Sequence, residues 1–228
     1  MKGTPKKVLI NGAGGKMGRA LVRLIQELPS LGLTVAATRK AGQEVKEDFD
    51  IIIDFSTPQG AQEAFALAKQ HRKPFLTGTT NLPEVFLFQM QQEEKIPVFF
   101  APNVSLSVYF FTELARQAAR MYTGYDVRLH EIHHVHKKDA PSGTAKNLAD
   151  AVNIPATQVT YERIGETVGT HEVKFNSPFD EISLTHKALN RDLFAKSALE
   201  IAVWLATCPA GFYTMSDYAK FKLKEHKK

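Results

Sequence analysis

The hydrophobic pattern of the first 105 residues alternates between short apolar runs and segments with apolar positions at helical spacing. The apolar runs predict strands over 6–12, 33–38, 49–56, 73–79 and 96–103. The helical spacing predicts helices over 15–28, 58–71 and 82–94. Strands that alternate with helices indicate a parallel α/β sheet, and continuous apolar strands indicate a sheet covered on both faces.

The pattern changes after about residue 105. Helices are predicted over 105–122 and 143–152, strands over 126–133, 158–164, 171–176 and 180–188, and a last apolar helix over 191–207. We therefore expect an α/β protein in which a Rossmann-like doubly wound parallel sheet carries an inserted α+β domain with a mixed, largely antiparallel sheet. The predicted domains are 1–105 plus 192–228 for a dinucleotide, and 106–191 for substrate binding and oligomerisation.

The composition argues against several classes of protein, namely disulfide-linked, cysteine–metal and membrane-spanning proteins. The single cysteine, Cys208, excludes an intrachain disulfide and a cysteine-based zinc or iron–sulfur cluster. No apolar run approaches the roughly 20 residues of a membrane span, and the first apolar run is too short for a signal peptide. These features predict a cytoplasmic protein with no membrane partner. The formal charge of +5 favours small anionic ligands and does not by itself argue for a nucleic acid.

A glycine-rich stretch, "NGAGGKMG" at 11–18, lies between the first predicted strand and the first predicted helix. Its spacing is G-x-x-G-x-x-G, which departs slightly from the usual G-x-G-x-x-G. Glycines let a diphosphate approach the backbone, and the helix start offers unpaired N–H groups. We interpret the stretch as a dinucleotide loop; the alternative is a purely structural turn.

The second strand ends in "TRK" at 38–40, where an NAD-binding domain normally carries an acid. Arg39 and Lys40 instead offer two cations where a 2′-phosphate would lie, so we expect NADPH to be preferred over NADH. The alternative is a solvated basic turn. Two more loops, 77–81 and 101–105, follow strands that should end at the same edge and leave room for a nicotinamide ring.

The stretch "LHEIHHVHKKDAPSGT" at 129–144 holds four histidines. A metal site is disfavoured because the histidines lack helical ligand spacing and would point to opposite faces of a strand. An acid–base cluster of histidine and lysine is favoured over a polar loop. "PSGT" is either an anion cradle at a helix start or an ordinary N-cap, and spacing alone does not separate the two.

The stretch "EIHHVHKKDAPSGTA" resembles the signature E-x-H-H-x-x-K-x-D-A-P-S-G-T-A of the 4-hydroxy-tetrahydrodipicolinate reductase (dihydrodipicolinate reductase) family, and every specified position matches. "GAGGKMG", "DFSTP", "GTT", "APNVS", "THKA" and Arg191 with Phe194 extend the resemblance over almost the whole chain. The resemblance implies NAD(P)H-dependent reduction of a cyclic dicarboxylic imine in lysine and diaminopimelate biosynthesis, by an enzyme that is usually a homotetramer.

The resemblance also implies site residues. His133 is the acid–base residue and Lys137 the proton donor, although which of the two delivers the final proton stays open. The substrate carboxylates are held by His134, Gly143 and Thr144. The cofactor is held by Gly12, Ala13, Gly14, Gly15, Lys16, Met17, Arg39, Gly78, Thr79, Thr80, Ala101, Pro102, Asn103 and Val104. No metal is implied.

The chain is shorter than the family pattern between the second and third strands and at 155–170. Subunit packing can therefore differ from that of the family. Two other classes compete with this interpretation. A dinucleotide sensor would need the glycine-rich loop but not the histidine–lysine cluster. The other class is another NADP-dependent reductase, such as an amino-acid or semialdehyde dehydrogenase. A semialdehyde dehydrogenase that acts by a phosphorylating route would need a nucleophilic cysteine, and Cys208, before a proline at the end of an apolar helix, is a poor candidate.

Overall fold

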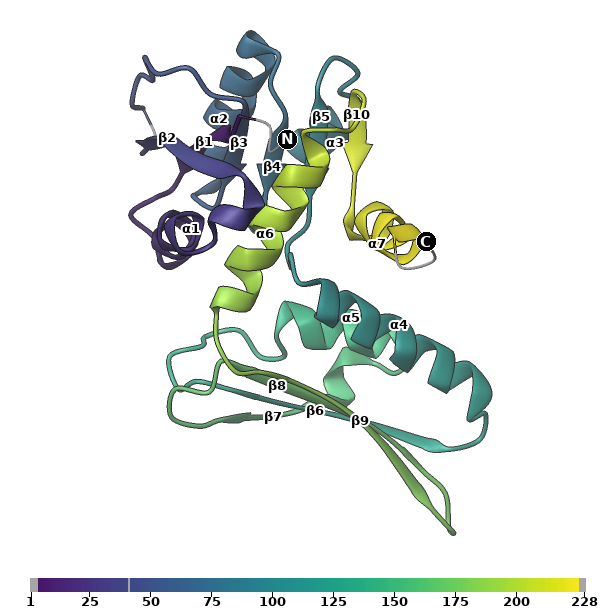
Figure 1. Ribbon diagram of the computed structural model, residues 1–228. Helices are drawn as coiled ribbons and strands as arrows, with labels where there is room; N and C mark the ends of the chain where they lie inside the picture. The colour runs from purple at the N-terminus through teal and green to yellow at the C-terminus, as the bar shows by residue number, and fades with distance from the viewer. Residues whose placement is uncertain (1–3, 41, 226–228) are drawn as a thin grey trace. The chain divides into compact units, whose positions relative to one another are not determined.

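The computed structural model describes residues 4–40 and 42–225, and Figure 1 shows its elements. The chain divides into two compact units. Unit 1 comprises Met1–Ser105 and Asp192–Lys228, and unit 2 comprises Leu106–Arg191. Among the described residues, no helix is both long enough and apolar enough to cross a membrane.

Unit 1 is built on a six-stranded sheet in the order β10-β5-β4-β3-β1-β2, and its neighbouring strands all run parallel. The strands are β1 (Lys6–Asn11), β2 (Leu33–Arg39), β3 (Ile51–Asp54), β4 (Phe75–Thr77), β5 (Pro97–Phe100) and β10 (Gly211–Tyr213). The chain runs outward from β1 in both directions. The strand order therefore reverses between β1 and β3, and in such sheets ligands bind at the carboxyl ends of the strands near this point.

Both faces of this sheet are covered, as the continuous apolar strands predict. Leu9, Ile52, Phe75 and Val98 lie side by side across β1, β3, β4 and β5 and are buried with residues of α2 (Pro58–His71) and α3 (Glu84–Gln91). The opposite face packs against α6 (Asp192–Leu205), which also contacts α1 (Lys16–Glu27). Helices on both faces make this a doubly wound sheet.

Unit 2 has a four-stranded sheet in the order β7-β6-β8-β9, with two helices on one face (Figure 1). The strands are β6 (Asp126–His133), β7 (Thr160–Arg163), β8 (Gly169–Asn176) and β9 (Glu181–Ala188), and the helices are α4 (Leu106–Met121) and α5 (Gly143–Ala151). Only the β6–β7 pair is parallel among the described strands. In β8, buried residues alternate with partly exposed ones, as expected for a sheet that is covered on one face.

The predicted fold class is confirmed, and two elements near the end of the chain were not predicted. β10 has only three residues, too few for a periodic signal, and α7 (Met215–Glu225) carries its apolar positions among lysines. The strand predicted over 158–164 is shorter in the structure, because Ala156–Gln158 forms a 3₁₀ turn before β7 begins at Thr160.

Candidate functional site

The glycine-rich loop connects β1 to α1, and two of its glycines leave no room for a side chain. Gly12 has φ +84°, and a Cβ added there would lie 2.3 Å from the backbone oxygen of Phe55. A Cβ added at Gly18 would lie 2.3 Å from the backbone oxygen of Gly12. The turn leads into α1 through Gly15, which offers no side-chain cap. The N–H groups at the start of α1 are thus arranged as in anion-binding helix termini.

The residues predicted to hold a cofactor all lie in unit 1, after strands that end at one edge of the sheet. Residues 12–17 follow β1, Arg39 ends β2, residues 78–80 follow β4, and residues 101–104 follow β5. Gly14, Gly15, Lys16, Thr80 and Pro102 are exposed, whereas Arg39, Gly78, Thr79, Ala101 and Val104 are buried. The structure therefore brings the predicted set to one edge, but only part of it can offer a side chain to a ligand.

A cavity of about 510 Å³ lies beside the glycine-rich loop. Its lining includes Gly14, Thr38 and four cations, Arg19, Arg23, Arg39 and Lys40. Arg23 is already paired with Glu27 at 2.8 Å and with Asp192 at 2.5 Å. Such a cationic lining suits a phosphate-bearing ligand, with affinity that depends on salt.

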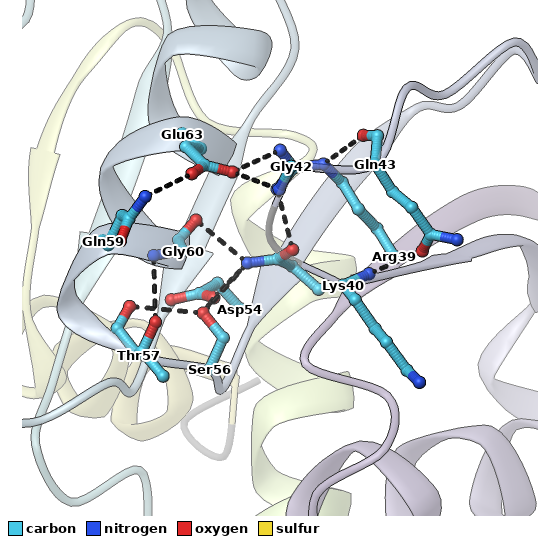
Figure 2. Close-up of polar contacts among 11 residues, drawn as sticks. Arg39, Lys40, Gly42, Gln43, Asp54, Ser56, Thr57, Gln59, Gly60 and Glu63 are labelled. Atoms are coloured by element: carbon cyan, nitrogen blue, oxygen red, sulfur yellow. Dashed lines mark hydrogen bonds and ion pairs between the residues drawn. The ribbon is translucent and has the colours of Figure 1, made fainter.

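The guanidinium of Arg39 is hydrogen-bonded to other residues of unit 1. The side chain of Arg39 is 7% exposed, and its Nη2 donates to Oε2 of Glu63 at 2.8 Å. Nη1 donates to Oδ1 of Asn11 at 3.0 Å, and Nε donates to the backbone oxygen of Gln43 at 2.9 Å. Figure 2 shows the contacts of Arg39 with Glu63 and Gln43 and shows the Lys40 side chain extending away from them. Lys40 is exposed and has no ion pair with any other described residue, so it is the more accessible cation.

Glu63 completes this network from α2. Its carboxylate also accepts from the backbone N–H of Gly42 at 2.7 Å. That hydrogen bond, together with the one from Arg39, lowers the pKa of Glu63 below its ordinary value. Glu63 therefore remains ionised and keeps the Arg39 guanidinium directed into the protein (Figure 2).

Asp54, at the carboxyl end of β3, joins three of the loops at this edge. It is fully buried, and its two oxygens accept from Asn11 Nδ2 at 2.7 Å, Ser56 Oγ at 2.5 Å, Thr77 Oγ1 at 2.7 Å and Thr79 Oγ1 at 2.7 Å. The hydroxyl of Thr79 thus holds the loop after β4 in place. A buried carboxylate that receives four donors fixes the loops around it.

Sequence reasoning did not assign a role to Asn11, Asp54 or Glu63. Asp54 had a visible signal, because an acid that ends a fully apolar strand is rarely buried without partners. Asn11 ends the first strand in the same way. Glu63 had no local signal, since it is one polar residue on a helix whose distance from Arg39 depends on the tertiary fold.

In unit 2 the four histidines of the stretch 129–144 lie in different surroundings. His133, the last residue of β6, is 7% exposed, and its ring lies 5.1 Å from the ring of His171. His130 has a different set of contacts, with Nδ1 2.8 Å from Oγ1 of Thr160. His136 is exposed beyond the strand, and His134 is half-buried. The alternation along β6 therefore separates His130 from His133, whereas His134 and His136 lie beyond the strand with their rings 6.2 Å apart.

Lys137 lies in the turn after β6, and its ammonium donates to both oxygens of Asp139 at 2.7 and 2.9 Å. Burial alone would raise the pKa of Asp139, but the hydrogen bond and the charge of Lys137 lower it below its ordinary value. Asp139 is therefore ionised near neutral pH, and its carboxylate accepts both hydrogen bonds from the ammonium of Lys137.

The "PSGT" turn starts α5. Ser142 is the N-cap, and its hydroxyl accepts from the N–H of Ala145 at 3.1 Å. The backbone N–H of Ser142 donates to Oε1 of Glu131 at 2.9 Å. Gly143 and Thr144 are the first two residues of the helix, and Gly143 is exposed. The N-cap alternative therefore describes Ser142, while an anion cradle at Gly143 and Thr144 stays a prediction.

Glu131 is the buried acid of this unit and was assigned no role from the sequence, although it is part of the signature. It is fully buried, with Oε1 3.2 Å from Nη2 of Arg163. Oε2 lies 3.3 Å from Nδ1 of His133 and 3.5 Å from Nε2 of His171. Burial alone would raise the pKa of Glu131, but the two imidazoles and Ser142 hold it far below its ordinary range.

The stability of unit 2 should depend on pH through His171. Burial lowers the pKa of this histidine below its ordinary 6.5. The unfolded chain therefore binds a proton before the folded chain does, and folding stability is lost as pH falls below 6.5. We expect the free energy of unfolding to fall between about pH 7.5 and about pH 5.5, and to fall less in His171→Gln.

Urea denaturation at both pH values measures this difference, and His136→Gln, at an exposed position, is the matched control. Equal pH dependence in the wild type and His171→Gln would contradict the assignment of His171 as a buried neutral base.

Two family models cover the chain. The model described as "Dihydrodipicolinate reductase, N-terminus" matches residues 6–104, and "Dihydrodipicolinate reductase, C-terminus" matches residues 107–218. A 4-hydroxy-tetrahydrodipicolinate reductase of Xanthomonas campestris pv. campestris is 40% identical over 95% of this chain and 99% of its own length. The enzyme of that name from Campylobacter jejuni subsp. doylei is 35% identical over 93% of this chain and 96% of its own length.

Among solved structures, the dipicolinate-bound dihydrodipicolinate reductase from Paenisporosarcina sp. TG-14 has a similar fold. Its TM-score is 0.71 at 20% sequence identity, and the match covers 92% of this chain and 97% of that one. The family predicted from the sequence is confirmed by both halves of the chain and by relatives of nearly the same length. This chain belongs to the dihydrodipicolinate reductase family and is an oxidoreductase of that family.

Proposed function

We propose that this reductase transfers a hydride from NADPH to 4-hydroxy-2,3,4,5-tetrahydrodipicolinate, giving 2,3,4,5-tetrahydrodipicolinate in lysine and diaminopimelate biosynthesis. One observation carries the proposal: the family signature folds so that a buried imidazole, a lysine and a helix start all lie in or next to one β6–α5 connection. These are the groups that reduction of an anionic imine needs, namely proton donors and partners for carboxylates.

Unit 1 is the proposed cofactor domain. Residues 12–17 and the start of α1 would hold the diphosphate, with no side chain in the way at Gly12. Residues 78–80 and 101–104 would flank the nicotinamide, which supplies the hydride when bound. The protein's part is to orient the cofactor, and the Asp54 network serves this by fixing the loops after β1, β3 and β4.

For the preference between cofactors, we propose that Lys40 contributes more than Arg39 to binding the 2′-phosphate. Lys40→Ala is expected to raise the Kd for NADPH roughly 10-fold, or about 1.4 kcal/mol, and to leave the Kd for NADH unchanged. Fluorescence titration at low and high salt measures this, and the difference should shrink as salt screens the contact. Lys46→Ala, at another exposed lysine on the same loop, is the matched control. If the Kd for NADPH stays unchanged in Lys40→Ala, the proposal is contradicted and Arg39 becomes the residue assigned to the 2′-phosphate.

Unit 2 is the proposed substrate domain. His133 and Lys137 would act as the acid–base pair, supplying a proton as negative charge develops on the substrate. His134, Gly143 and Thr144 would bind the two carboxylates, the last two at the start of α5, where backbone N–H groups favour anions. No metal is part of the proposal.

We also propose a homotetramer in the cytoplasm, assembled through the sheet of unit 2. The face of that sheet away from α4 and α5 carries partly exposed polar side chains, including Glu172 and Lys174 on β8. A second copy could cover this face with paired charges.

The direct test is loss of NADPH absorbance with the substrate generated in the cuvette from pyruvate and aspartate semialdehyde. The proposal predicts turnover with NADPH, and slower turnover with NADH at equal concentration. Tight NADPH binding without turnover would instead support a non-catalytic dinucleotide-binding protein.

A further inference from the structure

One oxygen of the Glu131 carboxylate is held by groups other than the histidines. Its Oε1 accepts from the backbone N–H of Ser142 at 2.9 Å and lies 3.2 Å from Nη2 of Arg163. Arg163 is itself held, because Nη2 donates to the backbone oxygen of Asp139 at 2.7 Å and the guanidinium lies 4.9 Å from the ring of Tyr161. The remaining oxygen, Oε2, therefore has a defined position within unit 2.

Oε2 faces two imidazoles. Nδ1 of His133 lies 3.3 Å away and Nε2 of His171 lies 3.5 Å away. Apart from these contacts, Oε2 and Nδ1 of His133 are both buried and have no hydrogen-bond partner among the described residues, so each is the nearest group that can satisfy the other. His171 has a second polar neighbour, since its Nε2 lies 3.4 Å from the hydroxyl of Ser142. Because burial lowers the pKa of His171, this ring stays neutral near pH 7. The negative charge of Glu131 is then left to interact with His133.

The opposite side of the His133 ring is kept clear by Gly169, the first residue of β8. A Cβ added there would lie 3.0 Å from Nε2 and 3.2 Å from Cδ2 of His133. The backbone does not demand glycine at this place, because its φ is outside the left-handed region. The requirement is for space beside Nε2.

We propose that Glu131 is the positioning residue of His133: it holds the Nδ1–H of the imidazole, so that Nε2, beside Gly169, is the atom that exchanges a proton with the substrate. The proposal rests on the proposed acid–base role of His133. It extends that role to a residue that touches neither substrate nor cofactor and acts only through the ring.

The proton inventory is simple. A neutral imidazole carries one ring proton, and a carboxylate beside Nδ1 selects the tautomer in which this proton is on Nδ1. The protonated ring carries a second proton on Nε2. When Nε2 gives that proton to the substrate, the N–H bonding electrons stay on the ring, His133 becomes neutral, and water replaces the proton. Throughout the cycle the Nδ1–H stays beside Glu131.

The same three side chains offer a rival interpretation. One ligand atom each from Glu131, His133 and His171 lies within 4.8 Å of the others, which is a spacing that a metal ion could use. The Arg163 cation, 3.2 Å from the other oxygen of Glu131, already offsets the single negative charge of this carboxylate and so disfavours a divalent ion beside it.

The test combines Glu131→Gln and Gly169→Ala with the control Glu162→Gln, an exposed glutamate on β7. The first readout is the ¹⁵N signal of the His133 ring, assigned by its loss in His133→Gln, and it needs no turnover. The wild type should show the Nδ1–H tautomer, and Glu131→Gln should lose that preference because a carboxamide can donate to Nδ1.

The second readout is kinetic. Glu131→Gln should lower kcat about 100-fold or more, with KM and the Kd for NADPH changed less than about 3-fold. Gly169→Ala, which removes no polar group, should lower kcat about 10-fold while the Nδ1–H tautomer is kept. Glu162→Gln should behave as the wild type does.

Several results would overturn the proposal: a wild-type ring protonated at Nε2, a folded Glu131→Gln with wild-type kcat, or wild-type activity that is lost in EDTA and restored by Zn²⁺. If Glu131→Gln does not fold, the wild-type tautomer and Gly169→Ala decide the question. If the wild type turns over no substrate, the proposed function fails, and the ring signals still decide whether Glu131 positions His133.

Discussion

Replacement of Lys137 by alanine is expected to lower kcat by about 100-fold or more, the usual effect of removing a general acid or a cation that stabilises developing charge. The Kd for NADPH and the free energy of unfolding should change little, because the side-chain hydrogen bonds of Lys137 go to Asp139, whose side chain is 55% exposed. Stopped-flow single-turnover measurements with saturating NADPH separate the chemical step from binding.

Lys138→Ala is the matched control, since this lysine is adjacent in the same turn and is exposed. It should keep kcat within about 2-fold of the wild type. A Lys137→Ala variant that keeps wild-type kcat while KM rises would contradict the proton-donor role and assign Lys137 to binding alone.

Replacement of Asp54 by alanine is expected to destabilise unit 1 by roughly 3–5 kcal/mol. The change removes the acceptor for four donors, those of Asn11, Ser56, Thr77 and Thr79, and leaves them inside a buried site. Because these donors hold the loops after three strands, NADPH binding should weaken as well. Urea denaturation followed by far-UV circular dichroism, with NADPH titration of the folded fraction, measures both effects.

Asp48→Ala is the control for this prediction. The side chain of Asp48 is 74% exposed, and its ion pair with Lys7 spans 3.8 Å. Such a pair contributes at most about 1 kcal/mol. If Asp54→Ala were destabilised no more than Asp48→Ala, the Asp54 network would not be what fixes these loops.

Most of the fold follows from local pattern. The apolar strands of unit 1 alternate with amphipathic helices, and parallel order follows from that alternation. In unit 2 the alternation of buried and exposed residues along β8 has the period of a half-covered strand. The end of the chain was less predictable, because β10 joins the sheet through three backbone pairings with β5 and carries no pattern of its own.

In the candidate site, too, some features could be predicted from the sequence and others depend on tertiary contacts. Gly12 and Gly18 could be singled out from sequence by their spacing, and the constraint on Gly18 is local because its Cβ would meet Gly12, whereas the backbone that excludes a side chain at Gly12 is that of Phe55 after β3. The partners of Arg39 could not, since Glu63 reaches it from a helix 24 residues away. Arg39 is predicted to hold the cofactor, and the structure shows its guanidinium bonded to Glu63 and Asn11 while the residue also lines the cavity beside the glycine-rich loop, so that role stays a prediction. Long-range ion pairs of this kind leave no periodic signature.

Glu131 shows the same limit in unit 2. The signature contains this residue, and spacing places it two positions from His133 on the same face of β6. Its contacts with Arg163 and His171 join it to β7 and β8, so their geometry depends on how three strands align. The sequence therefore indicated that Glu131 and His133 belong to the site, but only the structure showed which residues each of them contacts.

The most direct measurement of the central claim is deuterium transfer from NADPH that carries deuterium at both positions on C4 of the nicotinamide. Product formed from the substrate generated in the cuvette should carry one deuterium per turnover at the reduced carbon, detected by mass spectrometry, and transfer should fall in parallel with kcat in Lys137→Ala. Unlabelled product, or oxidation of NADPH without any reduced product, would contradict hydride transfer to the cyclic imine.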